Sequence, residues 1–340
     1  MHTGGHQQMK LLKRLGHQVL YRALQGFILF IRFMPYPLAI GLARSICILA
    51  WMLDSLHRKI ANIQLAQALG LEKTMLLSLK VFMSQGDIFI DAIRFSYMSD
   101  EELKKRVRVE GKQHVETAMA SPRGVMMITG HMNWEILGHI PRILGIEFCI
   151  MGDIMKIPGI QAVIEDIRSR CGLTLLPPRG GMVSLLTGEL RKGRTIGIII
   201  DQRGREYHRV YCDFFGMPAP TNPAPALIAL KGDALILPVS AVKNGRTYTF
   251  RFDEPIDSRL FGNDHEEIEK ITDCWKSRAI VSLSSAMQTW LETVIRRCPQ
   301  QWFWIHCRWL RRSDMKRLDP SVRGSFAHRV ASIAEKKEDS

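Results

Sequence analysis

The middle of the chain alternates short apolar runs with amphipathic segments. Val125–Thr129 (VMMIT) and Thr195–Ile200 (TIGIII) are short and continuously apolar, which is typical of strands buried on both faces. Further helical and strand-like runs alternate with them, at 133–144, 147–151, 158–171, 173–176 and 181–192. This alternation predicts βαβ units, and therefore an α/β fold with a central, mostly parallel sheet flanked by helices.

The segments on either side of this region also contain predicted helices and strands. Residues 55–120 read as helical, and 224–231 as another helix. Two alternating runs that meet at Asn244-Gly245 predict a strand pair over 234–242 and 247–253. A long helix is expected over about 265–297.

The most apolar part of the chain is its front, residues 10–34 and 37–53. Basic residues lead into it, and only 11 residues separate Arg32 from Arg44, whereas a full span needs about 20. We therefore expect two helices that lie in or dip into a membrane interface. One tilted span and a pair of buried core helices remain as alternatives.

Composition divides the chain into three parts. Residues 1–54 form the expected membrane-anchoring helical segment, and 55–310 the α/β domain. Residues 311–340 are of mixed charge and poor in large apolar side chains, so we expect a solvated polar tail.

The net charge of +14 favours an anionic partner, such as nucleic acid, an acidic protein or anionic lipid. No nucleic-acid motif is present and the basic residues are scattered, so nucleic acid is not expected. The seven cysteines include no CxxC pair, and we interpret Cys149 and Cys171 as packing residues. With neither GxGxxG nor a Walker A sequence, no nucleotide cofactor is expected.

Two polar clusters directly follow predicted strands, where open α/β sheets bind ligands. Gly130–Glu135 (GHMNWE) follows one strand, and Asp201-Gln202-Arg203 follows the other. His131 could act as a base near neutral pH, and Glu135 could orient it. The alternative is a helix N-terminus capped by His131 or Asn133.

Five motifs occur in order along the chain: ITGHMNWEILG, IIIDQRG, FFGMPAPT, LPVSAV and CPQQWFWIHCRW. Together they resemble the lipid A biosynthesis acyltransferase family, the late lauroyl and myristoyl acyltransferases of Gram-negative envelopes. Weaker similarity through RKIANIQLAQAL (58–69) and the apolar front extends the resemblance over nearly the whole chain.

The resemblance implies acyl transfer from an acyl-carrier-protein thioester to a glycolipid hydroxyl. His131 would then accept the proton of the hydroxyl, and Glu135 would fix its tautomer. Arg168 is the candidate cation for the oxyanion, although a solvent-facing arginine or a phosphate clamp is an equal alternative. Asp201 would brace the site, or simply cap a turn. The expected substrate-binding or oxyanion-stabilising residues are Arg168, Asp201, Gln202 and Asn133.

One departure from the family pattern concerns the acidic residue. The family places four residues between the histidine and the acid, whereas three separate His131 from Glu135. On a continuous helix this spacing leaves the two about 40° apart, with Cβ atoms about 5–6 Å from each other. A non-catalytic relative is therefore an alternative. A metal site on one helix face formed by His131, Glu135 and His139 is another, although no metal is expected.

The same resemblance implies the partners and the location. Acyl carrier protein is acidic, and the acceptor is an anionic glycolipid in a membrane leaflet, so a basic, anchored protein suits both. We expect the inner membrane with the catalytic domain on its cytoplasmic side. A different glycolipid acceptor is an alternative.

Overall fold

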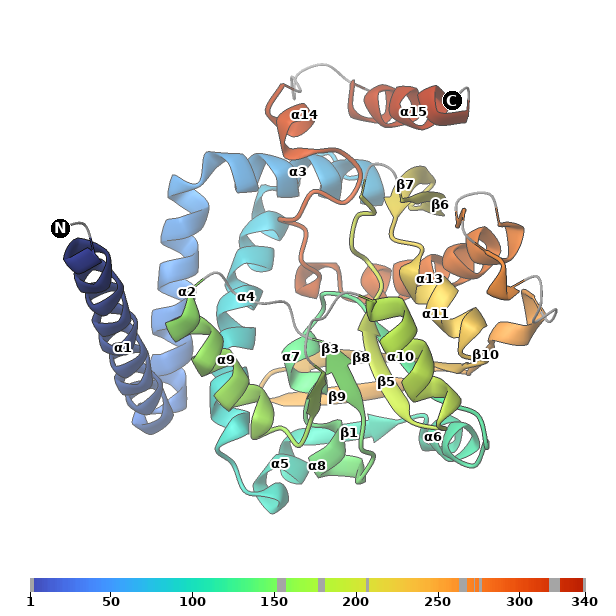
Figure 1. Ribbon diagram of the computed structural model, residues 1–340. Coiled ribbons are helices and arrows are strands. Elements are labelled where there is room, and N and C mark those ends of the chain that lie inside the picture. The colour runs from blue at the N-terminus through green and yellow to red at the C-terminus, as the bar shows by residue number, and fades with distance from the viewer. Residues whose placement is uncertain are drawn as a thin grey trace.

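The structure is a computed structural model with a mixed α/β fold (Figure 1). It describes residues 3–151, 157–176, 181–205, 208–262, 268–271, 273–274, 277–317 and 325–338. The predicted fold class is confirmed, because a mostly parallel central sheet lies among helices.

The central sheet has the strand order β1-β9-β8-β2-β5-β3-β4, and β10 pairs with β8. Its strands are β1 (Val107–Glu110), β2 (Val125–Thr129), β3 (Cys149–Met151), β4 (Thr174–Leu176), β5 (Thr195–Ile199), β8 (Leu235–Asn244), β9 (Thr247–Phe252) and β10 (Ile256–Asp257). β2 lies at the centre, parallel to β5 on one side and to β8 on the other. The β8–β9 pair is antiparallel about Asn244-Gly245, as predicted.

Each face of the sheet packs into its own core. On β2, Met126 and Ile128 belong to one cluster, and Val125 and Met127 to the other, because side chains alternate along a strand. The first face meets α10 (Met182–Arg191), α11 (Ala224–Lys231) and α13 (Arg278–Arg297). The second meets α5 (Asp100–Arg106), α6 (Lys112–Met119), α7 (Trp134–Leu137) and α8 (Ile140–Leu144).

Several predicted elements differ from those observed. The helix expected over 133–144 is divided into α7 and α8. α8 begins at Ile140 with Pro141 in its first turn, and Gly145 ends it in a left-handed conformation. The helix expected from 265 is wrong in its start: α13 begins at Arg278, capped by the Ser277 side chain, and residues 263–267 lie outside the described part.

Elements with weak sequence signals were not predicted. β1 lies within the stretch read as helical, and β6 (Val210–Phe214) and β7 (Met217–Thr221) form a separate hairpin across FFGMPAPT. The tail is not uniformly solvated: α14 (Arg312–Arg317) and α15 (Ser325–Glu338) bury Met315, Phe326 and Val330. In Figure 1, α15 lies at the top of the molecule, above β6 and β7.

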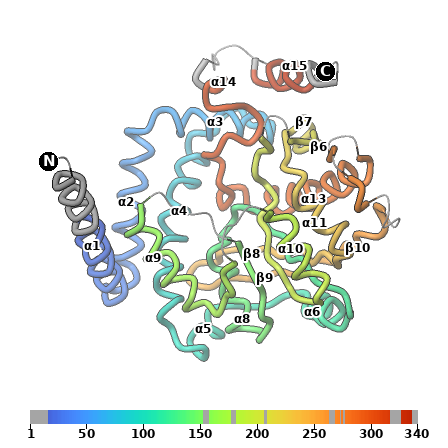
Figure 2. The backbone as a smooth tube through the Cα atoms, in the orientation of Figure 1, coloured from blue at the N-terminus to red at the C-terminus, as the bar shows by residue number. Residues whose placement is uncertain are grey.

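The N-terminal helices stand at one side of the molecule (Figure 2). They are α1 (Thr3–Phe33) and α2 (Tyr36–Leu53), followed by α3 (Ser55–Leu69) and α4 (Met75–Ser96). Among the described helices, only α2 is long and apolar enough to cross a membrane, and 17% of it is buried. Its exposed apolar side chains recur at helical spacing, at Leu38, Leu42, Ile46, Leu49 and Leu53. This exposure argues against two buried core helices and leaves the other two interpretations open.

The opposite side of α2 is tied to the sheet through two buried carboxylates, to which α2 contributes a half-exposed arginine. Arg44 of α2 makes two hydrogen bonds to Asp87 of α4, at 2.8 and 2.9 Å. Lys243 of β8 lies 2.5 Å from Asp91 and 3.2 Å from Asp87. Burial disfavours the charge of Lys243, but the two aspartates outweigh it and raise its pKa. Tyr248 also donates to Asp91, at the same Oδ2 atom that Lys243 contacts.

This network predicts a large effect for loss of the lysine charge. Lys243→Met leaves Asp87 and Asp91 buried with one cation fewer, and should lower the free energy of unfolding by about 3–5 kcal/mol. The control is Lys192→Met, which breaks an ion pair whose lysine is exposed and should cost under about 1 kcal/mol. Denaturant titration of both variants measures the difference, and equal losses would contradict the network's role.

Candidate functional site

The loop after β2 carries the candidate base. Gly130 lies so close to its neighbours that a Cβ would come within 2.7 Å of Leu291 and 3.1 Å of the Asp201 carboxylate. His131 follows in a bend, and Asn133 has a φ of 53°, so α7 begins only at Trp134. The continuous helix on which the spacing of His131 and Glu135 was considered is not formed, because the left-handed residue between them redirects the chain.

The carboxylate that holds His131 is Asp201, at the end of β5. The His131 Nδ1–H donates to Oδ1 at 2.6 Å, and the backbone N–H of His131 donates to Oδ2 at 2.7 Å. Asp201 is completely buried. Burial opposes its charge, but His131, through its charge and hydrogen bonds, outweighs burial and holds the pKa of Asp201 far below its usual range. With Nδ1 committed to Asp201, Nε2 is the ring nitrogen able to accept a proton.

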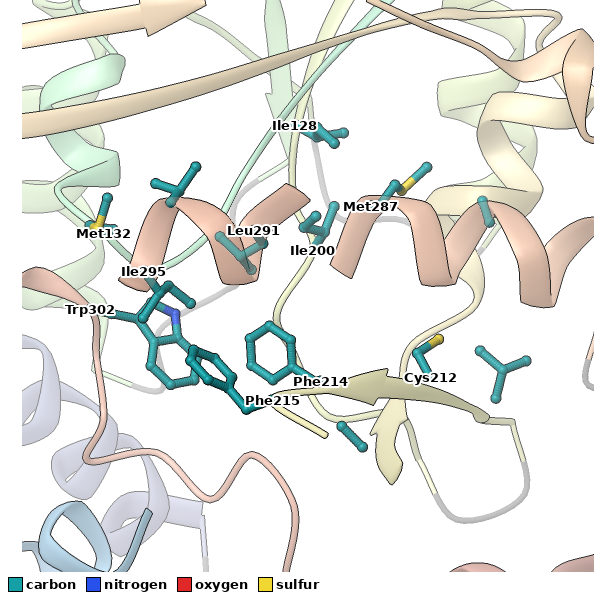
Figure 3. Close-up of a cluster of buried hydrophobic side chains, with 14 of the residues drawn as sticks. Ile128, Met132, Ile200, Cys212, Phe214, Phe215, Met287, Leu291, Ile295 and Trp302 are labelled. Carbon is teal, nitrogen blue, oxygen red and sulfur yellow. The ribbon is translucent and has the colours of Figure 1, made fainter. Parts of the chain in front are cut away.

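A third donor comes from the tryptophan-rich motif. The indole N–H of Trp302 donates to Oδ2 of Asp201 at 2.7 Å, and the backbone N–H of Phe303 donates to the His131 carbonyl at 3.1 Å. Figure 3 shows Trp302 beside Met132, Ile295 and Phe214 in the buried cluster. The motif therefore fixes both members of the His131–Asp201 pair.

Glu135 has a different partner from the one expected. Its Oε1 accepts from Arg168 Nη2 at 2.7 Å and from the Trp134 indole at 3.0 Å, and its Oε2 accepts from Arg168 Nε at 3.4 Å. The role of holding Nδ1, expected of Glu135, belongs to Asp201 in the structure. Glu135 instead positions the guanidinium of Arg168, which stands on α9 (Pro158–Ser169) and adjoins the same cavity.

Asn133 supports the loop from behind. Its Nδ2 donates to the Ala241 carbonyl at 2.8 Å and to Gln301 Oε1 at 2.6 Å, and the side chain is buried. Gln301 in turn exchanges hydrogen bonds with the backbone of Lys243. Both amide hydrogens of Asn133 are used within the protein and the residue does not line the cavity that contains His131, so its expected substrate or oxyanion contact stays a prediction.

The His131–Asp201 pair opens into a cavity of about 500 Å³, a size that suits a small ligand or a lipid chain. His131, Glu135, Arg168 and the exposed Gln202 provide polar groups along its lining. The apolar lining comes from strands and helices of both sheet faces, including Met127, Leu137, Ile140, Phe148, Leu186, Ile228 and Val239. Four predicted site residues therefore share one cavity, and Asp201 lies behind the histidine.

The cysteine at this cavity does not suit nucleophilic chemistry. Cys171 is buried, and burial raises the pKa of its thiol to about 11. All seven cysteines carry free thiols, so the expectation of packing residues holds for Cys149 and Cys171, which are both buried. The cavity favours proton transfer by His131 over a covalent enzyme intermediate.

The alternative metal site depended on a continuous helix. That helix is interrupted, and His139 is fully buried beside Cys171 and Phe95. Burial lowers the pKa of His139 to about 3. Within the described residues, no group of three or more His, Cys, Asp or Glu side chains is arranged to hold a metal ion.

Two aromatic residues of the site were not among those predicted from the sequence. Trp302 holds Asp201, and the ring of His306 lies 4.9 Å from Trp302 and 6.1 Å from His131. His306 Nδ1 donates to the Phe303 carbonyl, and burial lowers the pKa of the His306 ring. The motif CPQQWFWIHCRW was visible, but nothing in its spacing indicates which carboxylate its indole would reach.

Comparison with known proteins places these features in context. The sequence profile described as "Bacterial lipid A biosynthesis acyltransferase" matches residues 9–311. The chain is 24% identical over 180 residues to a phosphatidylinositol mannoside acyltransferase of Mycobacterium tuberculosis, which is 51% of this chain and 57% of the relative. It is 22% identical over 228 residues to a lipid A biosynthesis acyltransferase of Haemophilus influenzae, 66% of each protein. The matches thus cover slightly more than half to about two thirds of these relatives.

The low pKa of Asp201 predicts a pH-dependent contribution to stability. Its folded pKa lies below the unfolded value of about 3.9, so the stabilisation is complete above that pH and declines as the pH falls toward the folded pKa. The difference in unfolding free energy between wild type and Asp201→Asn should shrink by about 1.4 kcal/mol per pH unit below pH 4. Urea titrations from pH 7 to 3 measure it, and a difference independent of pH would refute the paired carboxylate.

Proposed function

Because the chain belongs to the bacterial lipid A biosynthesis acyltransferase family, we propose that it moves a fatty acyl chain from acyl carrier protein to a hydroxyl of a lipid A precursor. Membership supports acyl transfer to lipid A or a related glycolipid as the type of function. The donor, the acceptor and the membrane side are the proposal. The observation that carries it is the His131–Asp201 pair beside an apolar cavity of about 500 Å³.

In the proposed reaction, the acyl chain occupies the apolar cavity and its thioester carbonyl lies near His131. Nε2 of His131 takes the proton of the acceptor hydroxyl as the oxygen attacks the carbonyl carbon. Asp201 stabilises the imidazolium that results. When the C–S bond breaks, the imidazolium returns the proton to the departing thiolate, so the ester and a free thiol are the products.

Arg168 is the proposed donor to the oxyanion of the tetrahedral intermediate. A guanidinium has five N–H donors in a fixed plane, and Glu135 uses those of Nε and Nη2. The Nη1 group is left to donate elsewhere, and the residue lines the cavity that contains His131. Gln202, at the same cavity, is proposed to contact the substrate.

A non-catalytic role was suggested only by the short spacing between His131 and Glu135. The Asp201 carboxylate fills the place of a histidine partner, so that spacing no longer argues against catalysis. The second candidate is transfer to a different glycolipid. The similarity to mycobacterial phosphatidylinositol mannoside acyltransferases favours it, because their name specifies a phosphatidylinositol mannoside and not lipid A.

The proposed location is the cytoplasmic face of the inner membrane. The exposed apolar side of α2 continues over α1 through Val19, Phe27, Phe30 and Phe33. A patch of this kind marks a membrane or partner interface. The charge of +14 favours an anionic leaflet and an acidic carrier protein as donor.

One prediction of the proposed function concerns the proton-transfer pair. His131→Ala and Asp201→Asn should each lower the rate of acyl transfer at least about 100-fold, because the base is lost in one and its tautomer is no longer fixed in the other. Asp253→Asn is a matched control: Asp253 also accepts an indole N–H, from Trp290, but lies outside the cavity. Radiolabelled transfer to glycolipid is the measurement. Full activity in His131→Ala would refute the mechanism.

Another prediction of the proposed function concerns binding to the membrane. Ile46→Glu combined with Leu49→Glu adds two charges to the exposed side of α2 and should abolish flotation with vesicles, because a buried charge in lipid is costly. Leu260→Glu is the matched control, since Leu260 is 82% exposed and lies beside β10, away from α1 and α2. If the double variant floats like wild type, α2 is not the anchor.

A further inference from the structure

A second cavity, of about 580 Å³, lies where α1, α4 and α9 meet. Its polar lining includes Gln25, Arg32, Tyr97, Asp166 and Arg170. Its apolar lining consists of Ile28, Leu29, Met98 and Val163. The combination of cations with an apolar wall suits an amphiphile with an anionic head.

Two guanidinium groups converge on one ring in this cavity. The guanidinium carbon of Arg32 lies 4.8 Å from the centroid of Tyr97, and that of Arg170 lies 4.4 Å from it. Asp166 neutralises one of them, through two hydrogen bonds of 3.2 Å from Arg170. Cation–π contacts thus hold two positive charges at one ring, and Asp166 pairs with Arg170.

Arg32 is the cation that stays available. In the described part of the chain it contacts two aromatic rings, those of Phe33 and Tyr97, and forms no ion pair with a carboxylate. Its neighbours on this side differ: Arg44 is paired with Asp87, and Arg94 donates to two backbone carbonyls. An exposed guanidinium that stacks on aromatic rings and has no carboxylate partner is well suited to a phosphate group.

The cavity adjoins both the apolar surface and the proposed active site. Leu29 is 47% exposed and lines the cavity, and it belongs to the apolar side chains exposed on α1. α9 separates the two cavities: Ile164 and Arg168 line the first, whereas Asp166 and Arg170 line the second. A lipid bound here would have its head one helix away from His131.

We propose that this cavity binds the phosphate group of a membrane lipid, with Arg32 and Arg170 as donors. The acyl chains of that lipid would extend along the exposed apolar residues of α1. The phosphate could belong to a bulk phospholipid, as a diester, or to the glycolipid acceptor, as a monoester. The inference rests on the proposed membrane association but not on acyl transfer.

The test is flotation of the full-length protein with phosphatidylcholine vesicles that contain a fixed fraction of phosphatidic acid. Arg32→Gln and Arg170→Gln should each weaken binding on the order of tenfold, because each loses a charge-assisted hydrogen bond. The matched control is Arg108→Gln, which removes the same charge from an arginine 79% exposed on β1. Thermal unfolding of the three variants confirms that they are folded.

Two further arms identify the source of the phosphate. Equal losses on phosphatidylglycerol vesicles would support a phosphodiester lipid, whereas a loss confined to phosphatidic acid would support a monoester. Displacement of the vesicles by millimolar inorganic phosphate would overturn the lipid as occupant. Wild-type binding by Arg32→Gln and Arg170→Gln, or an equal loss in Arg108→Gln, would overturn the site.

The readout separates this inference from the proposed function. Absence of acyl transfer by the wild-type protein would refute the function and leave the vesicle comparison intact.

Discussion

The burial of one carboxylate organises this molecule. Asp201 is fully inaccessible to water, and an ionised carboxylate in such a place requires hydrogen-bond donors from the protein. The backbone and ring of His131 supply two, and the indole of Trp302 supplies a third. Three segments distant in sequence must therefore meet at one point: the end of β5, the loop after β2, and the chain that follows α13.

The surrounding structure follows from that meeting point. Gly130 is needed because any side chain would collide with Leu291 and approach the carboxylate. The left-handed Asn133 turns the chain away from the pair, and its amide is held by Gln301, which precedes Trp302 directly. The residues that hold the histidine and those that hold its carboxylate thus belong to one hydrogen-bonded unit.

The fold was largely predictable from the sequence, whereas the partners within the site were not. Buried parallel strands leave a strong local signal, so β2 and β5 could be located from VMMIT and TIGIII. The hairpin β6–β7 carries two prolines and no clear alternation, which hides it. The resemblance brought His131, Arg168 and Asp201 together as site residues. The pairing of His131 with Asp201 is a contact across 70 residues, and helical spacing had directed attention to Glu135 instead.

The charges beneath α2 have a geometric consequence. Arg44 joins α2 to α4, Lys243 joins α4 to β8, and Gln301 joins the backbone of Lys243 to Asn133 in the catalytic loop. A change in the tilt of α2 would draw the half-exposed Arg44 away from the buried Asp87 carboxylate. When α2 rests in a lipid surface, its depth therefore fixes the height of His131 above that surface. In the proposed reaction, His131 would then reach only those hydroxyls that a lipid presents at that height.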